Sequence, residues 1–306
     1  EDRAIFLKLV TEADVLLHNY RPGVLERLGF GYEALEAINP RLVYAAASGF
    51  GETGPLAGMA GQDFLIQSIS GIAWKSTGGA GQPSFLNVPV ADFSSGVLLA
   101  QGVLLALLER TRSGRGQRVS VSLLNSLIAM QMLEAATQLN YDYETRWYER
   151  ALNFVAECTD GWVTVIGFFR DNPLQLICAA LDLEDFSARP EWADKLKQAA
   201  HKEEIAALLR PAMRQLSVED CVGRLQDKGV LAAPIQTFEQ MLCHPQTEAN
   251  GLLIDVPVEG EDPMRVVGSP VHLSRTPAAV RRAPPKLDAH REDIRKNGGA
   301  DAWTRP

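Results

Sequence analysis

Cysteines, basic runs and long apolar segments are scarce in this 306-residue chain, and each shortage excludes a class of protein. The four cysteines lie far apart, with no Cys-x-x-Cys, so neither a zinc site nor a disulfide framework is indicated, and we expect no bound metal. Reduced thiols fit a cytoplasmic protein. The formal net charge is −8 and there is no long basic run, which argues against a nucleic-acid partner.

The sequence predicts no membrane-spanning segment. The longest apolar stretch, residues 97–108, is interrupted by Gln101 and Gly102 and is shorter than the ~20 residues needed to cross a bilayer. We see no signal peptide and therefore expect no membrane association. The chain begins at Glu1 with no methionine, and residues 1–10 have the pattern of a helix already under way. We expect an N-terminally truncated chain.

What the chain does contain is typical of a globular α/β protein with room for more than one domain. Hydrophobic residues make up 46% and charged residues 22% of the sequence. Short apolar strands at 13–20 and 42–48 alternate with helical segments, which predicts a parallel sheet flanked by helices. A second, α+β region is predicted from a hairpin around Asp160-Gly161, followed by amphipathic helices.

One acidic residue stands out in the segment VPVADFSSG, just before a long apolar helix predicted over 91–114. Asp92 is flanked by small residues on both sides. An aspartate in this position is commonly a helix N-cap. It can equally be an accessible carboxylate nucleophile. These residues alone leave both interpretations open.

Several separated segments resemble one family, in that family's order. They are ADVLLHNYRPGVLERLGFGYEALEAINPRLVYAAASGFGETGP, GQDFLIQSISG, VPVADFSSGVLLAQGVLLALLERTRSGRGQRVSVSLL, CTDGWVTV, GVLAAPIQTFEQMLCHPQTEANG, GSPVHLSRTP and APPKLDAH. Together they are similar to the class III CoA-transferases, the CaiB/BaiF family. This family includes formyl-CoA and carnitine CoA-transferases and also the α-methylacyl-CoA racemases. The resemblance runs essentially from end to end of the chain.

The resemblance implies an α/β fold with three parts. Residues 1–145 would be a large, Rossmann-like CoA-binding domain with a parallel sheet, lacking its first strand and helix. Residues 150–255 would be a smaller α+β domain, and residues 264–306 a segment that returns to the large domain. Two such chains would be interlocked as a homodimer.

The resemblance also implies a reaction. Asp92 matches the family's catalytic aspartate, which would carry CoA from an acyl-CoA to a carboxylic acid through mixed-anhydride and aspartyl-CoA thioester intermediates. Asp63 matches a second acidic position, which would assist protonation or orient the acid; a helix-capping role for it stays open. Coenzyme A would be a substrate, with no tightly bound cofactor. We expect free backbone N–H groups at Ser94–Gly96 to stabilise oxyanions.

CoA contacts are implied for the segment NYRPG and the residues after it. Asn19 and Tyr20 would line the path of the adenine and pantetheine groups. Arg21 and Arg27 would pair with phosphates. The alternative is that both arginines are solvated charges at a helix end. A family lysine that helps to hold the phosphates is replaced by Ala60.

Gln62 separates two branches of the family. The racemases carry histidine at this position, and glutamine cannot accept a proton at neutral pH. A transferase is therefore favoured, with a racemase or epimerase and an inactive CoA-binding fragment as alternatives. The sequence does not identify the donor acyl-CoA or the acceptor acid. A dicarboxylate would need an arginine near Asp92, and the candidates are Arg146, Arg150 and Arg170.

Overall fold

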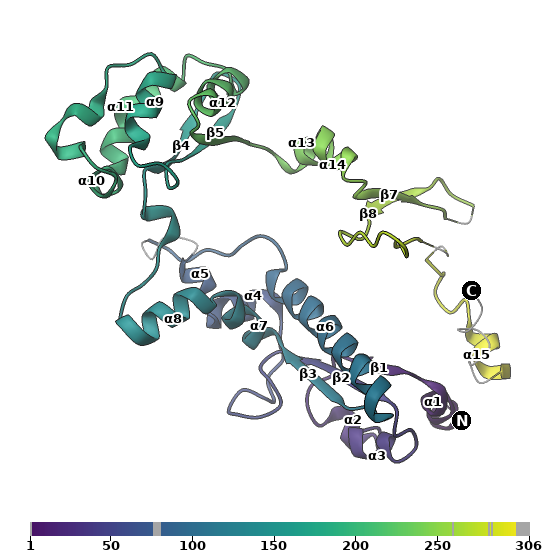
Figure 1. Ribbon diagram of the computed structural model, residues 1–306. Helices are drawn as coiled ribbons and strands as arrows, with labels where there is room; N and C mark the ends of the chain where they lie inside the picture. The colour runs from purple at the N-terminus through teal and green to yellow at the C-terminus, as the bar shows by residue number, and fades with distance from the viewer. Residues whose placement is uncertain (1, 76–80, 259, 281, 283, 298–306) are drawn as a thin grey trace. The chain divides into compact units, whose positions relative to one another are not determined.

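The computed structural model describes residues 2–75, 81–258, 260–280, 282 and 284–297 (Figure 1). The chain divides into two compact units, which are taken here one at a time. The first comprises Glu1–Thr145 with Pro285–Pro306, and the second comprises Arg146–Pro284. The predicted third segment, 264–306, is thus divided between the two units at Pro285. The assignment of domain roles to these units stays a prediction.

A three-stranded parallel sheet forms the centre of the first unit. Its strands are β1 (Val15–His18), β2 (Val43–Ser48) and β3 (Arg118–Ser122), in the order β1-β2-β3. The central strand is almost entirely buried, as expected of an apolar run covered on both faces. The predicted parallel α/β arrangement is confirmed. All three strands run the same way, so their carboxyl ends meet at one edge, where ligands bind in sheets of this type.

Helices cover both faces of this sheet. The helices α1 (Asp2–Glu12), α2 (Val24–Arg27) and α3 (Tyr32–Glu36) pack on the face that carries Tyr44 and Ala46. The opposite face carries the helix α6 (Val90–Ser113). A Cβ added at Gly102 of this helix would lie only 2.7 Å from the Cγ1 of Val119 in β3. This gives a layer of helices on each side of the sheet.

The helix α6 (Val90–Ser113) is the long apolar helix of the sequence, and it begins two residues before Asp92. Its length and composition alone would suffice to cross a membrane. Ala91, Ser95, Leu99 and Ala106 are buried, which makes α6 a core helix of this unit, while Leu104 and Leu108 are exposed in the single chain. Gly114, in the left-handed region with a φ of 76°, ends the helix as predicted.

Further helices complete the first unit: α4 (Asp63–Ile69), α5 (Ile72–Lys75), α7 (Leu123–Met130) and α8 (Met132–Tyr141). The helices α7 and α8 are separated by Gln131. The Gln131 side chain donates hydrogen bonds to the carbonyls of Ser70 (3.0 Å) and Leu127 (3.1 Å). A small core of Phe50, Ile66, Ala91 and Leu127 joins α4, α6 and α7 below the sheet edge.

The second unit is built on the antiparallel sheet β4 (Asn153–Glu157), β5 (Trp162–Ile166) and β6 (Leu231–Ile235). The predicted hairpin is confirmed, because Cys158 N–H donates to the Gly161 carbonyl at 2.8 Å. Its helices are α9 (Pro173–Ala180), α10 (Lys195–Ala200), α11 (Lys202–Met213), α12 (Val218–Asp227), α13 (Phe238–Leu242) and α14 (Pro245–Ala249), with short 3₁₀ turns at Trp147–Glu149, Phe186–Ala188 and Pro190–Trp192.

The end of the chain is a short hairpin followed by a helix of the first unit. Strands β7 (Leu253–Val256) and β8 (Met264–Val267) are antiparallel, and α15 (Arg291–Asn297) follows. Strand β8 ends at Val267, before the sequence Gly-Ser-Pro. Proline has no N–H for a strand ladder, which is consistent with this end.

Candidate active site

A cavity of about 240 Å³ opens at the carboxyl edge of the parallel sheet. It collects residues that directly follow each of the three strands, together with the start of α6. The residues that line it are Asn19, Arg21, Pro22, Ala47, Ser48, Gly49, Met59, Ala60, Gly61, Asp92 and Leu123. Asn19, Arg21 and Asp92, three of the six predicted site residues, therefore share one cavity.

Asp92 is the third residue of α6 and not its N-cap, which is Pro89. Partial burial, and then the nearby carboxyl of Asp63, raise the pKa of Asp92. Within the described part of the chain, the Asp92 carboxylate forms no ion pair. The side chain remains exposed toward solvent and the cavity. An accessible carboxylate without an ion-pair partner suits a nucleophile.

Asp63 caps a helix, but not its own. Gln62 is the N-cap of α4, and its side-chain oxygen accepts the Leu65 N–H at 3.3 Å. The Oδ2 of Asp63 instead accepts the N–H groups of Ala91 (2.7 Å) and Asp92 (3.0 Å), 28 and 29 residues further along. Asp63 is only 4% exposed and does not line the cavity. This position favours support of the Asp92 backbone over proton transfer to a substrate.

Gln67 completes this support, and sequence analysis did not single it out. It is fully buried, and its Nε2 donates to Asp63 Oδ1 at 2.6 Å. The same side chain donates to the carbonyls of Leu86 (3.1 Å) and Val88 (3.3 Å) and accepts the Leu86 N–H (2.9 Å). The chain leading into α6 is thus fixed to α4. The only sequence signal was the spacing of four between Asp63 and Gln67, which places both on one helix face.

The expected free N–H groups at Ser94–Gly96 are not at the helix start, because α6 begins four residues earlier. The first N–H groups of α6 are also occupied: those of Ala91 and Asp92 by Asp63, and that of Phe93 by the Pro89 carbonyl (2.9 Å). In contrast, the residues Gly49 and Gly61 line the cavity, and their N–H groups make no hydrogen bond within the described part of the chain.

The remaining predicted CoA contacts lie beside the cavity and do not line it. Tyr20 is 56% exposed. The Arg27 guanidinium folds back over the NYRPG turn, since a Cβ at Gly23 would lie 3.1 Å from its Nη1. Arg146, Arg150 and Arg170 belong to the second unit. Their relation to Asp92 stays a prediction.

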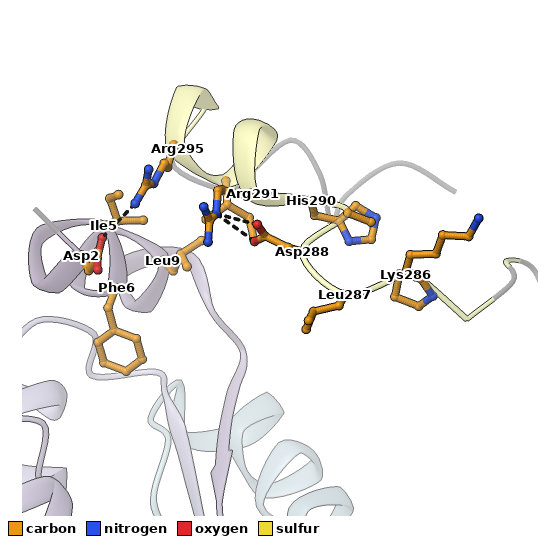
Figure 2. Close-up of a pocket in the computed structure, with 13 residues that line it drawn as sticks. Asp2, Ile5, Phe6, Leu9, Lys286, Leu287, Asp288, His290, Arg291 and Arg295 are labelled. Atoms are coloured by element: carbon orange, nitrogen blue, oxygen red, sulfur yellow. Dashed lines mark hydrogen bonds and ion pairs between the residues drawn. The ribbon is translucent and has the colours of Figure 1, made fainter.

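A larger cavity, of about 590 Å³, lies between α1 and residues 285–295 (Figure 2). Two of its cations are partnered: Arg291 pairs with Asp288 at 2.7 Å, and Arg295 with Asp2 at 4.0 Å. None of the predicted site residues lines it. Among the described residues, no group of three or more His, Cys, Asp or Glu side chains gathers as a metal site. The smaller cavity is therefore the candidate active site.

Comparison with known proteins gives consistent matches. Residues 1–291 match the model of CoA-transferase family III. An acyl-CoA transferase of Fusarium pseudograminearum is 32% identical over 99% of this chain and 68% of its own length. A succinate–glutarate CoA-transferase of Agrobacterium fabrum is 30% identical over 96% of this chain and 74% of its own. An acetyl-CoA:oxalate CoA-transferase of Acetobacter aceti is 31% identical over 98% and 77%.

Solved structures agree with these sequence matches. The crystal structure of a CaiB/BaiF family protein from Brucella suis superposes with a TM-score of 0.84 at 28% identity, covering 97% of this chain and 78% of that one. The family model spans nearly the whole chain. The chain therefore belongs to CoA-transferase family III and is a CoA-transferase, which moves CoA between acyl-CoA thioesters and carboxylic acids.

Proposed function

We propose that Asp92 is the covalent nucleophile of this transferase. Its carboxylate attacks the thioester carbonyl, the C–S bond breaks, and CoA leaves as the thiolate. The thiolate then attacks the aspartyl carbonyl of the mixed anhydride, which releases the donor acid and forms an aspartyl-CoA thioester. An acceptor carboxylate reverses both steps and regenerates Asp92. The observation that carries this proposal is the Asp92 carboxylate at the cavity on the sheet edge, which has no ion-pair partner among the described residues.

The N–H groups of Gly49 and Gly61 are our candidates for stabilising the oxyanions of these steps. Both residues line the cavity with Asp92, and within the described chain both N–H groups are without an acceptor. Fixed donors facing a developing negative charge are among the largest contributions to catalysis of acyl transfer.

Trapping the aspartyl-CoA thioester tests the assignment. The protein is incubated with a panel of acyl-CoAs and quenched in acid, and the peptide containing Asp92 is examined by mass spectrometry. We expect the mass of CoA, less one water, on Asp92. An adduct on another residue, or transfer with no covalent adduct under any quench, would contradict the proposal.

The racemase alternative has no support at Gln62. Its amide oxygen is used as the N-cap of α4, accepting the Leu65 N–H. An amide also lacks the basicity needed to remove an α-proton. We expect no deuterium exchange at the α-carbon of a 2-methylacyl-CoA in deuterated buffer.

We propose a small dicarboxylic acid as the substrate acid, held at its far carboxylate by Arg21. Arg21 lines the same small cavity as Asp92 and has no anionic partner within the described chain. The pantetheine arm separates the phosphates of CoA from its thiol, so an arginine beside Asp92 suits a carboxylate better than the phosphate contact expected from the sequence. The Agrobacterium and Acetobacter relatives are named for succinate, glutarate and oxalate.

Arg21→Gln is therefore expected to discriminate between acids. The KM for a four- or five-carbon dicarboxylic acid should rise roughly ten- to a hundredfold, as for loss of a charged hydrogen bond. The KM for the monocarboxylic acid of equal length should stay within about threefold. Steady-state kinetics with both acids and one acyl-CoA donor gives the comparison. An equal rise in KM for both acids, together with a raised KM for the acyl-CoA donor, would instead indicate that Arg21 contacts a CoA phosphate.

We also expect a single methyl group added at Gly61, in the cavity wall, to reduce activity. Gly49 and Gly61 meet back to back, and a Cβ on either would overlap the backbone of the other. Gly61→Ala must displace this wall, so we expect kcat/KM to fall by about a hundredfold, the scale of a small misplacement at a reacting site. Gly58→Ala is the matched control, since its Cβ meets nothing within 4 Å. Equal activities of the two variants would contradict this role.

We also propose that the protein works as the interlocked homodimer expected from the sequence. Leu104, Leu105 and Leu108 form an exposed apolar stripe on α6, and Leu133 and Leu139 are exposed on α8. Exposed apolar clusters of this kind mark association surfaces. Light scattering on the purified protein should give the mass of two chains; a concentration-independent monomer would exclude it.

A further inference from the structure

A polar cluster beneath the cavity holds the two loops that form its walls. His18, the last residue of β1, accepts the Tyr20 N–H through its Nδ1 at 3.3 Å. Arg118, the first residue of β3, pairs with Glu52 at 2.6 Å. Residues 19–22 and 49–52 are the two loops fixed in this way, and each contributes residues to the cavity.

The His18 ring is enclosed by aromatic neighbours. It stacks on Tyr20 with ring centroids 6.2 Å apart and meets the buried Tyr44 edge-on at 5.2 Å. With Nδ1 accepting a hydrogen bond, the neutral ring carries its proton on Nε2. That Nε2 is buried and has no partner among the described residues. The ring is therefore set in one tautomer by the Tyr20 N–H alone.

The charged groups around His18 come from three elements. Glu26 reaches it from α2, Glu52 from the loop after β2, and Arg118 from β3. Burial is the leading effect and lowers the pKa of His18, with Arg118 acting in the same direction and the two glutamates opposing it. Only the neutral ring can accept the Tyr20 N–H. Because the pKa of His18 is lowered, the ring stays neutral to a lower pH than an ordinary histidine does.

We propose that His18 is a positioning residue for the active site, whose Nδ1 fixes the turn at residues 19–22 so that Asn19 and Arg21 face the cavity of Asp92. The inference rests on the proposed function of that cavity. His18 itself does not line the cavity and touches no reacting atom. A proton on Nδ1 would oppose the Tyr20 N–H and release the turn.

A pair of variants tests this role. Asn places an amide oxygen close to the position of Nδ1, whereas Gln extends its amide toward the position of Nε2. We expect His18→Asn to keep the KM for acyl-CoA within about twofold of the parent protein. For His18→Gln we expect a rise of roughly five- to tenfold, the loss of one hydrogen bond, with kcat changed less than twofold.

The pH dependence supplies a readout that a purely structural role would not move. In the parent protein the KM for acyl-CoA should rise as the pH falls through the titration of His18. In His18→Asn, which has no titrating ring, this rise should be absent. Equal KM values for the Asn and Gln variants, or an unchanged acid rise in both, would overturn the proposal.

Binding of CoA itself separates failure of this inference from failure of the proposed function. The Kd for CoA can be measured by calorimetry without turnover. We expect the parent protein and His18→Asn to have similar Kd values and His18→Gln to have a higher one, and this order tests the turn alone. If the trapping experiment finds no aspartyl-CoA but this order holds, the covalent mechanism fails and the role of His18 stands. If the adduct forms but all three Kd values agree, the role of His18 fails.

Discussion

Asp92→Asn is expected to reduce CoA transfer by at least about a thousandfold, as for loss of a covalent nucleophile, and to abolish the CoA adduct on the peptide. An amide oxygen is a poor nucleophile toward a thioester and cannot leave again as a carboxylate. Transfer between one acyl-CoA and one acid, followed by chromatography of the CoA esters, gives the rate. Residual transfer above a hundredth of the parent rate would contradict the assignment.

The stability of the same variant separates chemistry from folding. Burial and the neighbouring Asp63 carboxyl raise the pKa of Asp92, so the folded state disfavours the charged form. A raised carboxyl pKa contributes stability at low pH that is lost as the pH rises through the folded value. At neutral pH, Asn removes this unfavourable charge, and Tm should be equal to or above that of the parent. A marked fall in Tm would mean that Asp92 is chiefly structural.

The acid limb of activity follows from the same shift. Asp92 must be ionised to attack, so the rate of adduct formation should fall as the pH drops through its titration. Because the pKa is raised, this midpoint should lie above the pKa of an ordinary aspartate. Single-turnover rates in a series of buffers measure it, and the midpoint should not move with the choice of acyl-CoA.

Local sequence patterns were sufficient to predict the strands that frame the site. The apolar run in 42–48 specifies the buried strand β2, and the run within 13–20 contains β1, which is partly exposed rather than buried. The apolar segment around Asp92 forms α6, of which Asp92 is the third residue. The resemblance then supplied the chemistry that the pattern left open. Strand ends and a helix start are local features, whereas the site roles of Asn19, Arg21 and Asp92 came from the family resemblance.

The role of Asp63 could not be predicted in this way. A local pattern assigns an aspartate at the start of DFLIQSISG to its own helix, but Gln62 takes that cap. The Asp63 carboxyl turns instead to N–H groups 28 and 29 residues away. The helix start at Val90, four residues before the expected N–H groups, has the same cause, because Asp63 supplies the acceptors that the first turn needs. Both depend on tertiary packing of α4 against α6.

Asp63→Asn is the second substitution with a large expected effect. The two carboxyl oxygens accept from opposite sides, Oδ1 from Gln67 and Oδ2 from the Ala91 and Asp92 N–H groups. An amide can offer an oxygen to only one side and must turn its NH₂ toward a donor on the other. Gln67 cannot invert to compensate, since its oxygen accepts the Leu86 N–H and its NH₂ donates to two carbonyls.

We therefore expect Asp63→Asn to lower the free energy of unfolding by about 1–3 kcal/mol, the cost of buried unsatisfied polar groups. We expect kcat to fall by about a hundredfold, because the backbone that carries Asp92 is no longer held. Denaturant unfolding and single-turnover kinetics measure the two effects. The acid midpoint of adduct formation should also move lower, since the Asp63 charge that helps to raise the pKa of Asp92 is gone.

Removing the Gln67 contact alone provides the control. Gln67→Met keeps the Asp63 carboxyl on the α6 N–H groups but removes the donor to Oδ1. It should be destabilised, yet its acid midpoint should stay near that of the parent, because both carboxyl groups remain. If Asp63→Asn shifted the midpoint with no loss of kcat, its effect would be electrostatic only. Equal midpoints and a loss of kcat in both variants would instead assign the whole effect to packing.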